Sequence, residues 1–391
     1  MTQVHFTLKT EDIQNIIEKS VRDETSKKIL QTLFNQLMEH QRTEYIQADS
    51  YERSSDRTAQ RNGYYTRDYT TRIGTLELKV PRTRDGKFSP DVFERYQRNE
   101  KALVASMLEM YISGVSTRKV SKIVEELCGK SVSKSFVSSL TSQLDPIVKN
   151  WQDRKLSDTK YPYVMVDVIF IKVREHHRVV SKSCHIALGV SEAGNREILG
   201  FMIQDSESKD SWTNFFDYLK NRGLSGTKLL ISDAHKGLVS SIKTSFSQVS
   251  WQRCQVHFLR NIFQKTPKKN SKKFREAVKA IFKFKDIDSA RRAKNDLIKD
   301  YEDKAKYEKA CRIFDEGFED AFQYLVAGNG HNRLKSTNLL ERLNGEIRRR
   351  EKVIRIFPNT PSANRLIGSL LMDHHEKWIG SSRRYINTDN D

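Results

Sequence analysis

Cysteine is scarce in this sequence, and the four cysteines are too scattered to form a disulfide framework. Long hydrophobic runs are also missing, since no apolar stretch approaches the roughly 20 residues that a membrane span requires. The first residues, MTQVHFTLKTEDI, contain no basic segment followed by an apolar one, as a secretion signal would. These absences argue against a secreted or membrane protein, and they predict a protein of the reducing cytoplasm.

Negative charge is in short supply relative to positive charge. The 391 residues include 69 Lys and Arg against 50 Asp and Glu, and the isoelectric point is near 9.6. A polyanion is therefore the expected partner. Nucleic acid fits this pattern better than a membrane surface, because the positive charge is spread along the whole chain.

Two aspartates stand where apolar residues would be expected. Asp167 interrupts the apolar segment YVMVDVIFIKV (163–173), and Asp233 directly follows the apolar run LLIS (229–232). An unpaired carboxylate in such a setting is costly, so each should be hydrogen-bonded, paired with a charge or bound to a cation. The pair is the first indication of a metal site.

The middle of the chain has the element order of a mixed sheet with helices on it. The pattern predicts strands at 163–173, 179–190 and 197–203, a helix at 209–222, a strand at 228–232, a helix after Lys236 and a strand at 249–252. Three antiparallel strands followed by alternating helix and strand is the order of the RNase H-like nuclease fold. In that order the middle of the first strand lies beside the end of the fourth, so Asp167 and Asp233 can share one cation.

The chemistry of phosphodiesters calls for a third acid. Two divalent cations about 3.5–4 Å apart can hold the attacking and leaving oxygens in line while negative charge develops. Mg²⁺ prefers carboxylate oxygens and keeps several waters, so few protein ligands are expected, but two aspartates are not quite enough. On the helix predicted from Asn338, Glu341 lies near the face that carries Asn344 and Arg348, away from the buried stripe. Periodicity alone favours a solvated glutamate at this position.

The N-terminal third contains helices and a small β segment. Residues 11 to about 45 carry apolar positions at helical spacing, which predicts an amphipathic helix or a helix pair. The stretch 61–88 alternates Thr, Tyr, Ile, Leu and Val and is broken by Asn62-Gly63, Gly74 and Asp85-Gly86, which predicts strands with tight turns.

Residues 103–144 have the pattern of three short helices joined by short turns. Gly114 can end the first helix, Ser116 or Thr117 can cap the second, and Ser133 can cap the third. This is typical of a helix-turn-helix whose last helix enters a major groove of DNA, although a plain three-helix bundle has the same pattern.

If the helix-turn-helix interpretation holds, particular side chains meet the DNA. Lys134 and Ser135, at the start of the third helix, are best placed to contact base edges or phosphates. Arg118, Lys119 and Lys122 would face the DNA backbone, and solvated surface charge explains these three almost as well.

Further candidates lie after Asp233. Cys254 and His257 form a C-x-x-H pair, but a zinc site needs two more soft ligands and no second pair is apparent, so we expect no zinc. Packing behind the site, or contact with a DNA end, is the preferred role of this pair. The lysine-rich helical stretch 258–336 is expected to be an insertion whose charge suits the flank of a duplex, unless it is a solvated helix surface with charge pairs.

Several arginines lie near Glu341. Arg342, Arg348, Arg349 and Arg350 follow it on the same predicted helix, and the first three are the candidates for DNA contact. A guanidinium group can hold a phosphate in a fork, which would press the DNA strand against the metals. A solvated helix face is an equally good explanation.

An ordered set of segments resembles one known family. RNGYY with VPRTRDGKF, then GVSTRKVSKIVEEL, VDVIFIKVRE, HIALGV, ISDAHKGL, WQRCQVHF and TNLLERLNGEIRRR together resemble the mutator-type transposases of bacterial insertion sequences, over nearly the whole chain. The resemblance implies a catalytic Asp, Asp, Glu triad at Asp167, Asp233 and Glu341 that holds two Mg²⁺ or Mn²⁺ ions. It also implies that relatives carry the C-x-x-H pair after the second aspartate.

The expected fold is an RNase H-like α/β catalytic domain with an all-α insertion, preceded by a mainly α-helical DNA-binding region. In chain order we expect an N-terminal helical region, a small β segment, a helix-turn-helix domain, the first part of the catalytic core, the insertion, the last core helices with the third acid, and a flexible tail. These correspond to residues 1–60, 61–100, 101–150, 151–257, 258–336, 337–380 and 381–391.

The expected function is that of a DNA transposase. The resemblance implies an enzyme that binds the terminal inverted repeats of its insertion sequence, cleaves the element ends and joins the 3′ hydroxyl to target DNA. Double-stranded DNA is the expected partner, a homodimer the expected active form, and the nucleoid in the bacterial cytoplasm the expected place. The alternative is a sequence-specific DNA-binding regulator whose nuclease-like domain is not catalytic. An enzyme acting on RNA is less consistent with an N-terminal pattern that suits duplex DNA.

Overall fold

The computed structural model describes residues 24–71, 74–92, 100–128 and 132–387. The chain forms two compact units, one up to Gln143 and one from Leu144. Each unit has its own core.

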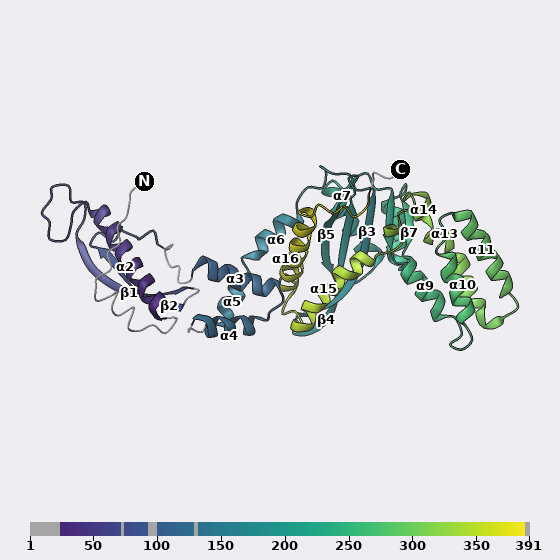
Figure 1. Ribbon diagram of the computed structural model, residues 1–391, viewed down its shortest axis with the longest axis horizontal. Helices are drawn as coiled ribbons and strands as arrows, with labels where there is room; N and C mark the ends of the chain where they lie inside the picture. The colour runs from purple at the N-terminus through teal and green to yellow at the C-terminus, as the bar shows by residue number, and fades with distance from the viewer. Residues whose placement is uncertain (1–23, 72–73, 93–99, 129–131, 388–391) are drawn as a thin grey trace. The chain divides into compact units, whose positions relative to one another are not determined.

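The first unit begins with a helix packed on a two-stranded sheet. Helix α2 (Glu24–Ile46) lies on the antiparallel pair β1 (Arg61–Thr71) and β2 (Gly74–Thr83), as drawn in Figure 1. Met38 of the helix is buried against Leu76, Leu78 and Val80, which alternate along β2 as a strand with one buried face requires. The predicted helix and β segment are confirmed for these residues, whereas predicted helical positions 11–23 lie outside the described part of the chain.

One predicted turn is wrong. Asn62 and Gly63 do not reverse the chain but lie within β1, where the pairing register shifts between Arg61 and Tyr64. Gly63 has a φ of 67°, so it supplies the left-handed residue of a bulge rather than of a hairpin turn. The buried Arg42 guanidinium lies beside this bulge, where its Nη1 donates to the carbonyl oxygen of Gly63 at 3.1 Å.

Three short helices complete the first unit. They are α3 (Lys101–Ile112), α4 (Thr117–Cys128) and α5 (Lys134–Thr141), and they enclose a core that includes Met107, Val120, Val124 and Val137. The predicted caps are confirmed, because Gly114 has a φ of 92° after α3, and the Ser133 hydroxyl accepts from the Phe136 N–H at 3.0 Å.

The second unit is built on a mixed five-stranded sheet. The strands are β3 (Tyr163–Glu175), β4 (Arg178–Val190), β5 (Arg196–Gln204), β6 (Leu229–Ser232) and β7 (Ser250–Arg253), in the spatial order β5-β4-β3-β6-β7. Strands β3, β4 and β5 are antiparallel neighbours, and β6 and β7 run parallel to β3. The predicted element order is confirmed, with the first and fourth strands side by side.

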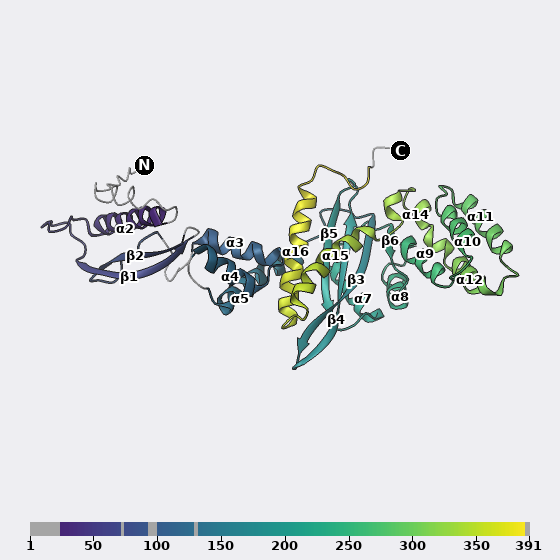
Figure 2. The same ribbon diagram turned by 60° about the horizontal axis from the view of Figure 1, so that its bottom comes forward.

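Helices cover both faces of this sheet. Val164 and Val166 of β3 pack with α7 (Lys209–Asn221) and α8 (Lys236–Ser245), in a core that includes Trp212 and Phe216. The other face meets α6 (Leu144–Gln152), α15 (Asn338–Ile354) and α16 (Thr360–Ile379), and Figure 2 shows α15 and α16 lying against the sheet. Because strand side chains alternate between faces, Asp167 must point toward α15 when Val166 points toward α7.

The segment between β7 and α15 is helical, as predicted. Its helices are α9 (Gln255–Gln264), α10 (Lys272–Ile281), α11 (Ile287–Asp300), α12 (Glu308–Glu316), α13 (Phe318–Ala321) and α14 (Gln323–Val326), with single 3₁₀ turns at Ala305–Tyr307 and Asn332–Leu334. Buried phenylalanines that include Phe258, Phe314, Phe318 and Phe322 form its core. The helical part begins at Gln255 rather than at residue 258, because Cys254 still donates to the Ser232 carbonyl at 2.7 Å at the end of the sheet.

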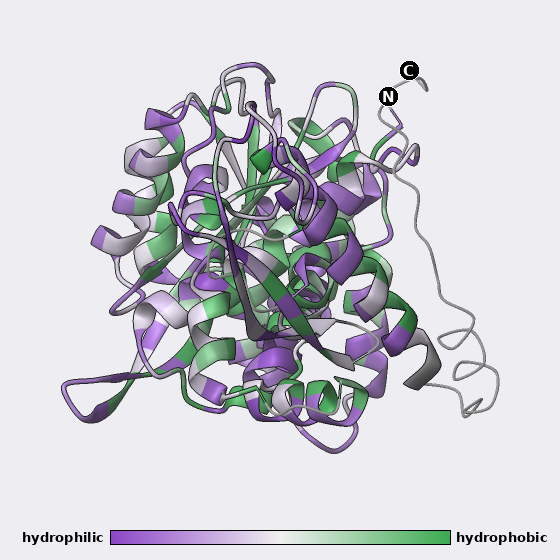
Figure 3. Cartoon of the chain, turned by 90° about the vertical axis from the view of Figure 1, so that its left-hand side faces the viewer, coloured by the Kyte–Doolittle hydropathy of each residue, from purple (hydrophilic) through white to green (hydrophobic). Residues whose placement is uncertain are grey.

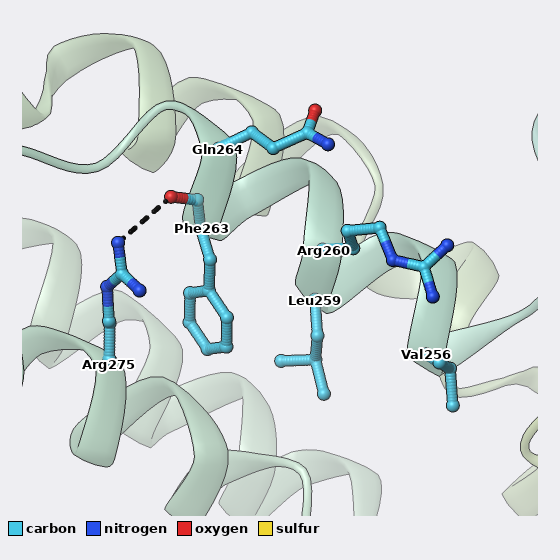
Figure 4. Close-up of a pocket in the computed structure, with 6 residues that line it drawn as sticks. All are labelled: Val256, Leu259, Arg260, Phe263, Gln264 and Arg275. Carbon is cyan, nitrogen blue, oxygen red and sulfur yellow. Dashed lines mark hydrogen bonds between the residues drawn. The ribbon is translucent and has the colours of Figure 1, made fainter. Parts of the chain in front are cut away.

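Helices α9 and α10 border a shallow, mainly apolar hollow of about 470 Å³. Leu259 and Phe263 line it, and Arg275 of α10 donates to the Phe263 carbonyl at 3.2 Å, as Figure 4 shows. No acidic side chain lines this hollow, so it is not a candidate for metal-dependent chemistry.

Two predicted boundaries differ from the structure. Helix α6, expected at the end of the helix-turn-helix domain, belongs to the second unit, because Asp145 pairs with Arg365 of α16 at 2.7 Å. The tail expected to be flexible from residue 381 is packed as far as residue 387. Ile386 is buried, and its N–H donates to the Gly194 carbonyl at 3.1 Å.

Several helices are amphipathic, such as α10 and α12, and the helices in Figure 3 carry both hydrophilic and hydrophobic residues. Helix α16 differs, because its residues from Arg365 to Leu371 are all buried. Among the described residues, no helix combines the length and the apolar character needed to cross a membrane.

Two buried histidines make the stability of the second unit depend on pH. Burial lowers the pKa of both His185 and His375 from 6.5 to about 4. Between these values the unfolded chain binds more protons than the folded one, so stability is full above pH 6.5 and is lost as pH falls toward 4. At pH 5 each histidine should lower the free energy of unfolding by about 2 kcal/mol relative to pH 7. We expect the His375→Asn variant to lose about 2 kcal/mol less stability between pH 7 and pH 5 than the unchanged protein, as measured by urea unfolding.

The matched control is His177→Asn, at the exposed tip of the β3–β4 hairpin. This variant should lose as much stability between pH 7 and pH 5 as the unchanged protein does. An equal loss in His375→Asn would contradict the assignment.

Candidate active site

Asp167 lies in the middle of β3 on the face covered by α15. Its Oδ1 accepts from the Val168 N–H at 2.9 Å, and its Oδ2 accepts from Asn344 Nδ2 at 2.8 Å. These two bonds fix the direction of the carboxylate. Of the three expectations for this carboxylate, namely hydrogen bonding, charge pairing or cation binding, the structure shows hydrogen bonding.

Asp233 reaches the same end of the sheet from β6. The parallel register pairs Met165 with Ile231, so Asp167 and Asp233 each lie two residues beyond this pair. Asp233 Oδ1 accepts from the N–H of His235 at 3.2 Å, which holds the turn between β6 and α8. The two aspartates are thus brought together by strand pairing, although they are far apart in the chain.

The surroundings of Asp167 disfavour its charge. Burial is the largest of the effects that raise the pKa of its carboxyl to about 6; the nearby carboxylates of Asp233 and Glu341 act in the same direction, whereas the Val168 N–H and His257 act to lower it. A site that destabilises an ionised carboxylate in this way is suited to binding a cation.

Asn344 was not singled out by the sequence. It was expected on the same exposed face as Arg348, but its side chain is buried beneath Asp167, and its Oδ1 has no hydrogen-bond partner among the described residues. An unpaired buried amide oxygen is uncommon and is open to a further ligand such as a cation or water. Its only signal in the sequence is its position three residues after Glu341, one helical turn along α15.

Glu341, in the first turn of α15, lies beside His257 of α9. The distance from Glu341 Oε1 to His257 Nε2 is 3.3 Å, and both side chains are partly exposed. A hydrogen bond with Cys254 raises the pKa of His257 above its usual value, and Asp167 and Glu341 act in the same direction. In this arrangement the acid expected from resemblance contacts a histidine whose pKa is raised.

The C-x-x-H pair anchors the helix that carries Glu341. Cys254 is buried, and its sulfur accepts from the N–H and the hydroxyl of Thr337, each at 3.5 Å, just before α15 begins. Burial acts to raise the pKa of this thiol, but hydrogen bonds with His257 and Thr337 outweigh burial and lower it. Cys254 and His257 thereby connect β7 and α9 to the start of α15.

A further acid near Asp233 was missed by sequence reasoning. Glu207, just before α7, is largely buried, and its Oε1 lies 3.3 Å from His235 Nδ1 and accepts from Trp212 Nε1 at 3.2 Å. Burial raises the pKa of Glu207, and Asp233 contributes in the same direction. No pattern in the sequence distinguishes this glutamate from other polar residues before a helix.

The acidic residues do not form a ready-made metal cage. Among the described residues, no group of three or more His, Cys, Asp or Glu side chains is arranged to hold a metal ion. The donor set nevertheless fits a hard cation, because Asp167, Asp233 and Glu341 offer carboxylate oxygens and Asn344 offers an unpaired amide oxygen. A bound cation would also offset the cost of ionising Asp167.

The expected DNA contacts of the first unit lie on its surface. Arg118, Lys119 and Lys122 are exposed on α4, where Lys122 is 3.6 Å from Glu126. Lys134 and Ser135 are exposed in the first turn of α5. All five are accessible, and none is needed for the core.

The arginines after Glu341 differ from one another. Arg349 forms an ion pair with Glu346, which also pairs with Arg350 at 2.6 Å. Arg348 is exposed and forms no ion pair with any described residue, and Arg342 is exposed and faces a separate cavity. Of the three arginines expected to contact DNA, Arg342 and Arg348 are free of carboxylate partners.

Comparison with known proteins gives a consistent result. The family model described as "Transposase, Mutator family" matches residues 1–381. The chain is 74% identical to the transposase for insertion sequence element IS256 in transposon Tn4001 of Staphylococcus aureus, over 100% of both chains. It is 40% identical to the transposase for insertion sequence element ISRM5 of Rhizobium meliloti (strain 1021), covering 93% of this chain and 90% of that one.

Solved structures are more distant. The strand transfer complex of the Drosophila P element transposase matches with a TM-score of 0.32 and 11% sequence identity, covering 75% of this chain and 83% of that chain. This similarity is too low to add to the description of the fold.

The cost of ionising Asp167 can be measured. A folded-state pKa of about 6, above the ordinary 3.8, means that stability is full below pH 3.8 and is lost as pH rises through 6. At pH 7 without divalent cations, the free energy of unfolding of Asp167→Asn should exceed that of the unchanged protein by about 1–3 kcal/mol. The amide carries no charge, although it can accept only one of the two hydrogen bonds. Urea unfolding in EDTA measures this difference.

The difference should shrink as the pH is lowered toward 4, where Asp167 of the unchanged protein is protonated. Asp217→Asn, on the exposed face of α7, is the matched control and should leave stability unchanged. An Asp167→Asn variant no more stable than this control would refute the assigned cost.

Proposed function

Because this chain belongs to the Mutator family of transposases, we propose that it is the DNA transposase of a bacterial insertion sequence. In this proposal it binds the terminal inverted repeats of the element, cleaves the element ends and transfers the 3′ hydroxyl to target DNA. It acts in the cytoplasm at the nucleoid, as a homodimer that brings two ends together.

The single observation that supports catalysis best is the position of Asp167. A regulator would gain stability from an apolar residue or an amide at the centre of β3, yet the chain places there a carboxylate whose pKa is raised to about 6 by burial and by two other acids. We therefore favour an enzyme over a DNA-binding regulator with a non-catalytic domain.

The sheet supports an RNase H-like assignment. The order β5-β4-β3-β6-β7, with β6 and β7 parallel to β3, is the order expected for that fold. It presents Asp167 and Asp233 on adjacent strands, and α15 adds Glu341 from the side. We propose that these three acids form the catalytic triad.

The proposed cofactor is a pair of Mg²⁺ or Mn²⁺ ions. Asp167, Asp233 and Glu341 would hold them, with the Asn344 amide oxygen close by. When bound, such ions polarise the scissile phosphate and lower the pKa of the attacking water or hydroxyl. Because Mg²⁺ keeps several waters and accepts phosphate oxygens as ligands, a site that lacks a complete protein cage is compatible with it.

The protein's own groups have distinct parts in this mechanism. Asn344 keeps the Asp167 carboxylate in one orientation through its 2.8 Å hydrogen bond. His257 holds Glu341 at 3.3 Å, and Cys254 fixes both His257 and the start of α15. Arg348 is free to hold a phosphate of the strand that is cut, and Arg349 can do so only by leaving Glu346.

DNA recognition is assigned to the first unit. We propose that α3, α4 and α5 act as a helix-turn-helix in which Lys134 and Ser135 face the major groove and Arg118, Lys119 and Lys122 face the backbone. All five side chains are exposed, as this role requires. The excess of basic residues in the chain supports duplex DNA as the partner.

Removal of the acids tests the catalytic assignment. Alanine at Asp167, Asp233 or Glu341 should abolish cleavage and strand transfer on terminal-repeat DNA, a loss of at least about a thousandfold, because phosphoryl transfer depends on charge stabilisation at the metals. Binding of the same DNA should persist in a gel-shift assay, since the proposed recognition helices are unchanged. Asp217→Ala, on α7, provides the control with full activity.

Strand transfer retained in any one of the three variants would remove that residue from the triad. Loss of DNA binding together with activity would instead indicate a structural role.

Metal binding can be followed without activity. We expect Mg²⁺ or Mn²⁺ to raise the melting temperature of the protein and EDTA to reverse the rise, because a ligand that binds only the folded state stabilises it by about 2.7 kcal/mol at a hundred times its dissociation constant. The double variant Asp167→Asn/Asp233→Asn should show no such rise. The same increase in the double variant would mean that the ions bind elsewhere.

A further inference from the structure

A polar cavity, separate from the apolar hollow at α9 and α10, lies beside the first turn of α15. It has a volume of about 470 Å³ and is lined by arginines from four parts of the second unit, together with one tyrosine. We name it the arginine pocket, and the side chains that define it are Arg196, Arg333, Arg342, Arg383, Arg384 and Tyr385.

Four of the six charged and aromatic side chains that define the pocket are arginines without a carboxylate partner among the described residues. No acidic residue lines the cavity, and Arg196, Arg333, Arg342 and Arg383 form no ion pair with any carboxylate in the described part of the chain. Burial lowers the pKa of Arg196, and the nearby Arg333, Arg383 and Arg342 lower it further. Gathering like charges in one cavity is unfavourable unless an anion enters it.

Contacts with aromatic rings and a backbone carbonyl hold two of the pocket arginines in place. The Arg196 guanidinium lies over the rings of Trp378 at 4.6 Å and Tyr385 at 5.8 Å, and that of Arg333 lies over Tyr385 at 4.9 Å. Arg333 Nη1 also donates to the Tyr385 carbonyl at 2.5 Å. Stacking and hydrogen bonding of this kind hold guanidinium groups in fixed positions.

The chain closes the pocket with the segment 382–387. The N–H groups of Tyr385 and Ile386 donate to the Gly194 carbonyl at 2.8 and 3.1 Å. Gly194 has a φ of 79°, and a Cβ there would meet the Ile386 carbonyl oxygen at 1.9 Å, so only glycine permits this contact. The match to the family model ends at residue 381, so this segment lies beyond it.

We propose that the arginine pocket binds a phosphate group of the DNA backbone and thereby positions the strand next to the catalytic acids. Arg342 directly follows Glu341, and Asn338, the first residue of α15, presents the positive end of that helix to the cavity. A phosphodiester group carries the charge and the oxygen acceptors that forked guanidinium donors match. This proposal rests on the proposed function, since it takes DNA as the partner.

The test measures how DNA binding depends on salt. The probe is a fluorescent duplex from the element end, bound to the full-length protein in EDTA over a series of NaCl concentrations. The variant Arg342→Ala/Arg383→Ala removes two exposed guanidinium groups, and we expect the slope of log K against log salt to fall by about one for one lost phosphate contact. Lysine at both positions should restore most of the slope but bind more weakly, because an ammonium group lacks the fork.

The control is Lys377→Ala on α16. This cation is also exposed, but its Nζ already lies 2.6 Å from Asp373 Oδ2, so its loss should leave the salt slope unchanged. Melting temperatures of all variants establish that each is folded. Added inorganic phosphate serves as a second probe, because it can enter the pocket without DNA.

The outcomes separate this inference from the proposed function. If the unchanged protein does not bind duplex DNA, both fail. If it binds, and the alanine variant keeps the same slope, only the role of the arginine pocket fails. Inorganic phosphate that raises the melting temperature of the unchanged protein but not of the variant, with an unchanged slope, would assign the pocket to a small free anion and overturn the proposal.

Discussion

The main physical constraint in the second unit is the burial of one carboxylate, that of Asp167, inside a sheet. Its strand supplies apolar neighbours on both sides, and β6 brings Asp233 to the same edge. Burial and like charge together raise the pKa of Asp167 to about 6, so the fold carries a cost at this point that an amide would avoid. Two hydrogen bonds from the surrounding elements offset part of that cost. Asn344 donates to Asp167 from α15, and the Val168 N–H donates from the strand itself.

The position of α15 follows from the same requirement. Its start is tied to the sheet through Thr337 and the Cys254 sulfur, and its middle through Asn344 and Asp167. These attachments, at Thr337 and Asn344, lie about two helical turns apart and restrict rotation of the helix about its axis. Glu341 lies between them and is therefore held beside His257. This gives the C-x-x-H pair a physical role, because it fixes the helix that carries Glu341.

Part of this arrangement could be predicted from the sequence. Strand and helix order, the adjacency of Asp167 and Asp233 and the cap at Ser133 follow from local patterns, since alternation, turn residues and capping act over a few positions. Asn344 and Glu207 could not be predicted, because their burial depends on contacts across the fold rather than on their neighbours in the chain. The order of the tail was missed for the same reason, since it depends on Gly194, a turn residue far away in the sequence. Glu341 was identified only through resemblance, and its contact with His257 is compatible with that role.

Helix α15 separates two kinds of charge. Asn344 and Glu341 face the acids of the sheet, whereas Arg342 faces a cavity that is lined by several arginines and by no acidic residue of the described chain. Neighbouring residues on a helix point about 100° apart, so one turn of α15 can present an acid to a cation and a guanidinium to an anion at the same time. Each cluster of like charge is unfavourable in the protein alone. A cation would stabilise the acids of the sheet, and an anion would stabilise the arginines of the pocket. Under the proposed function, a phosphodiester accompanied by divalent cations would supply both components, the cations to the acids of the sheet and the phosphate to the arginine pocket.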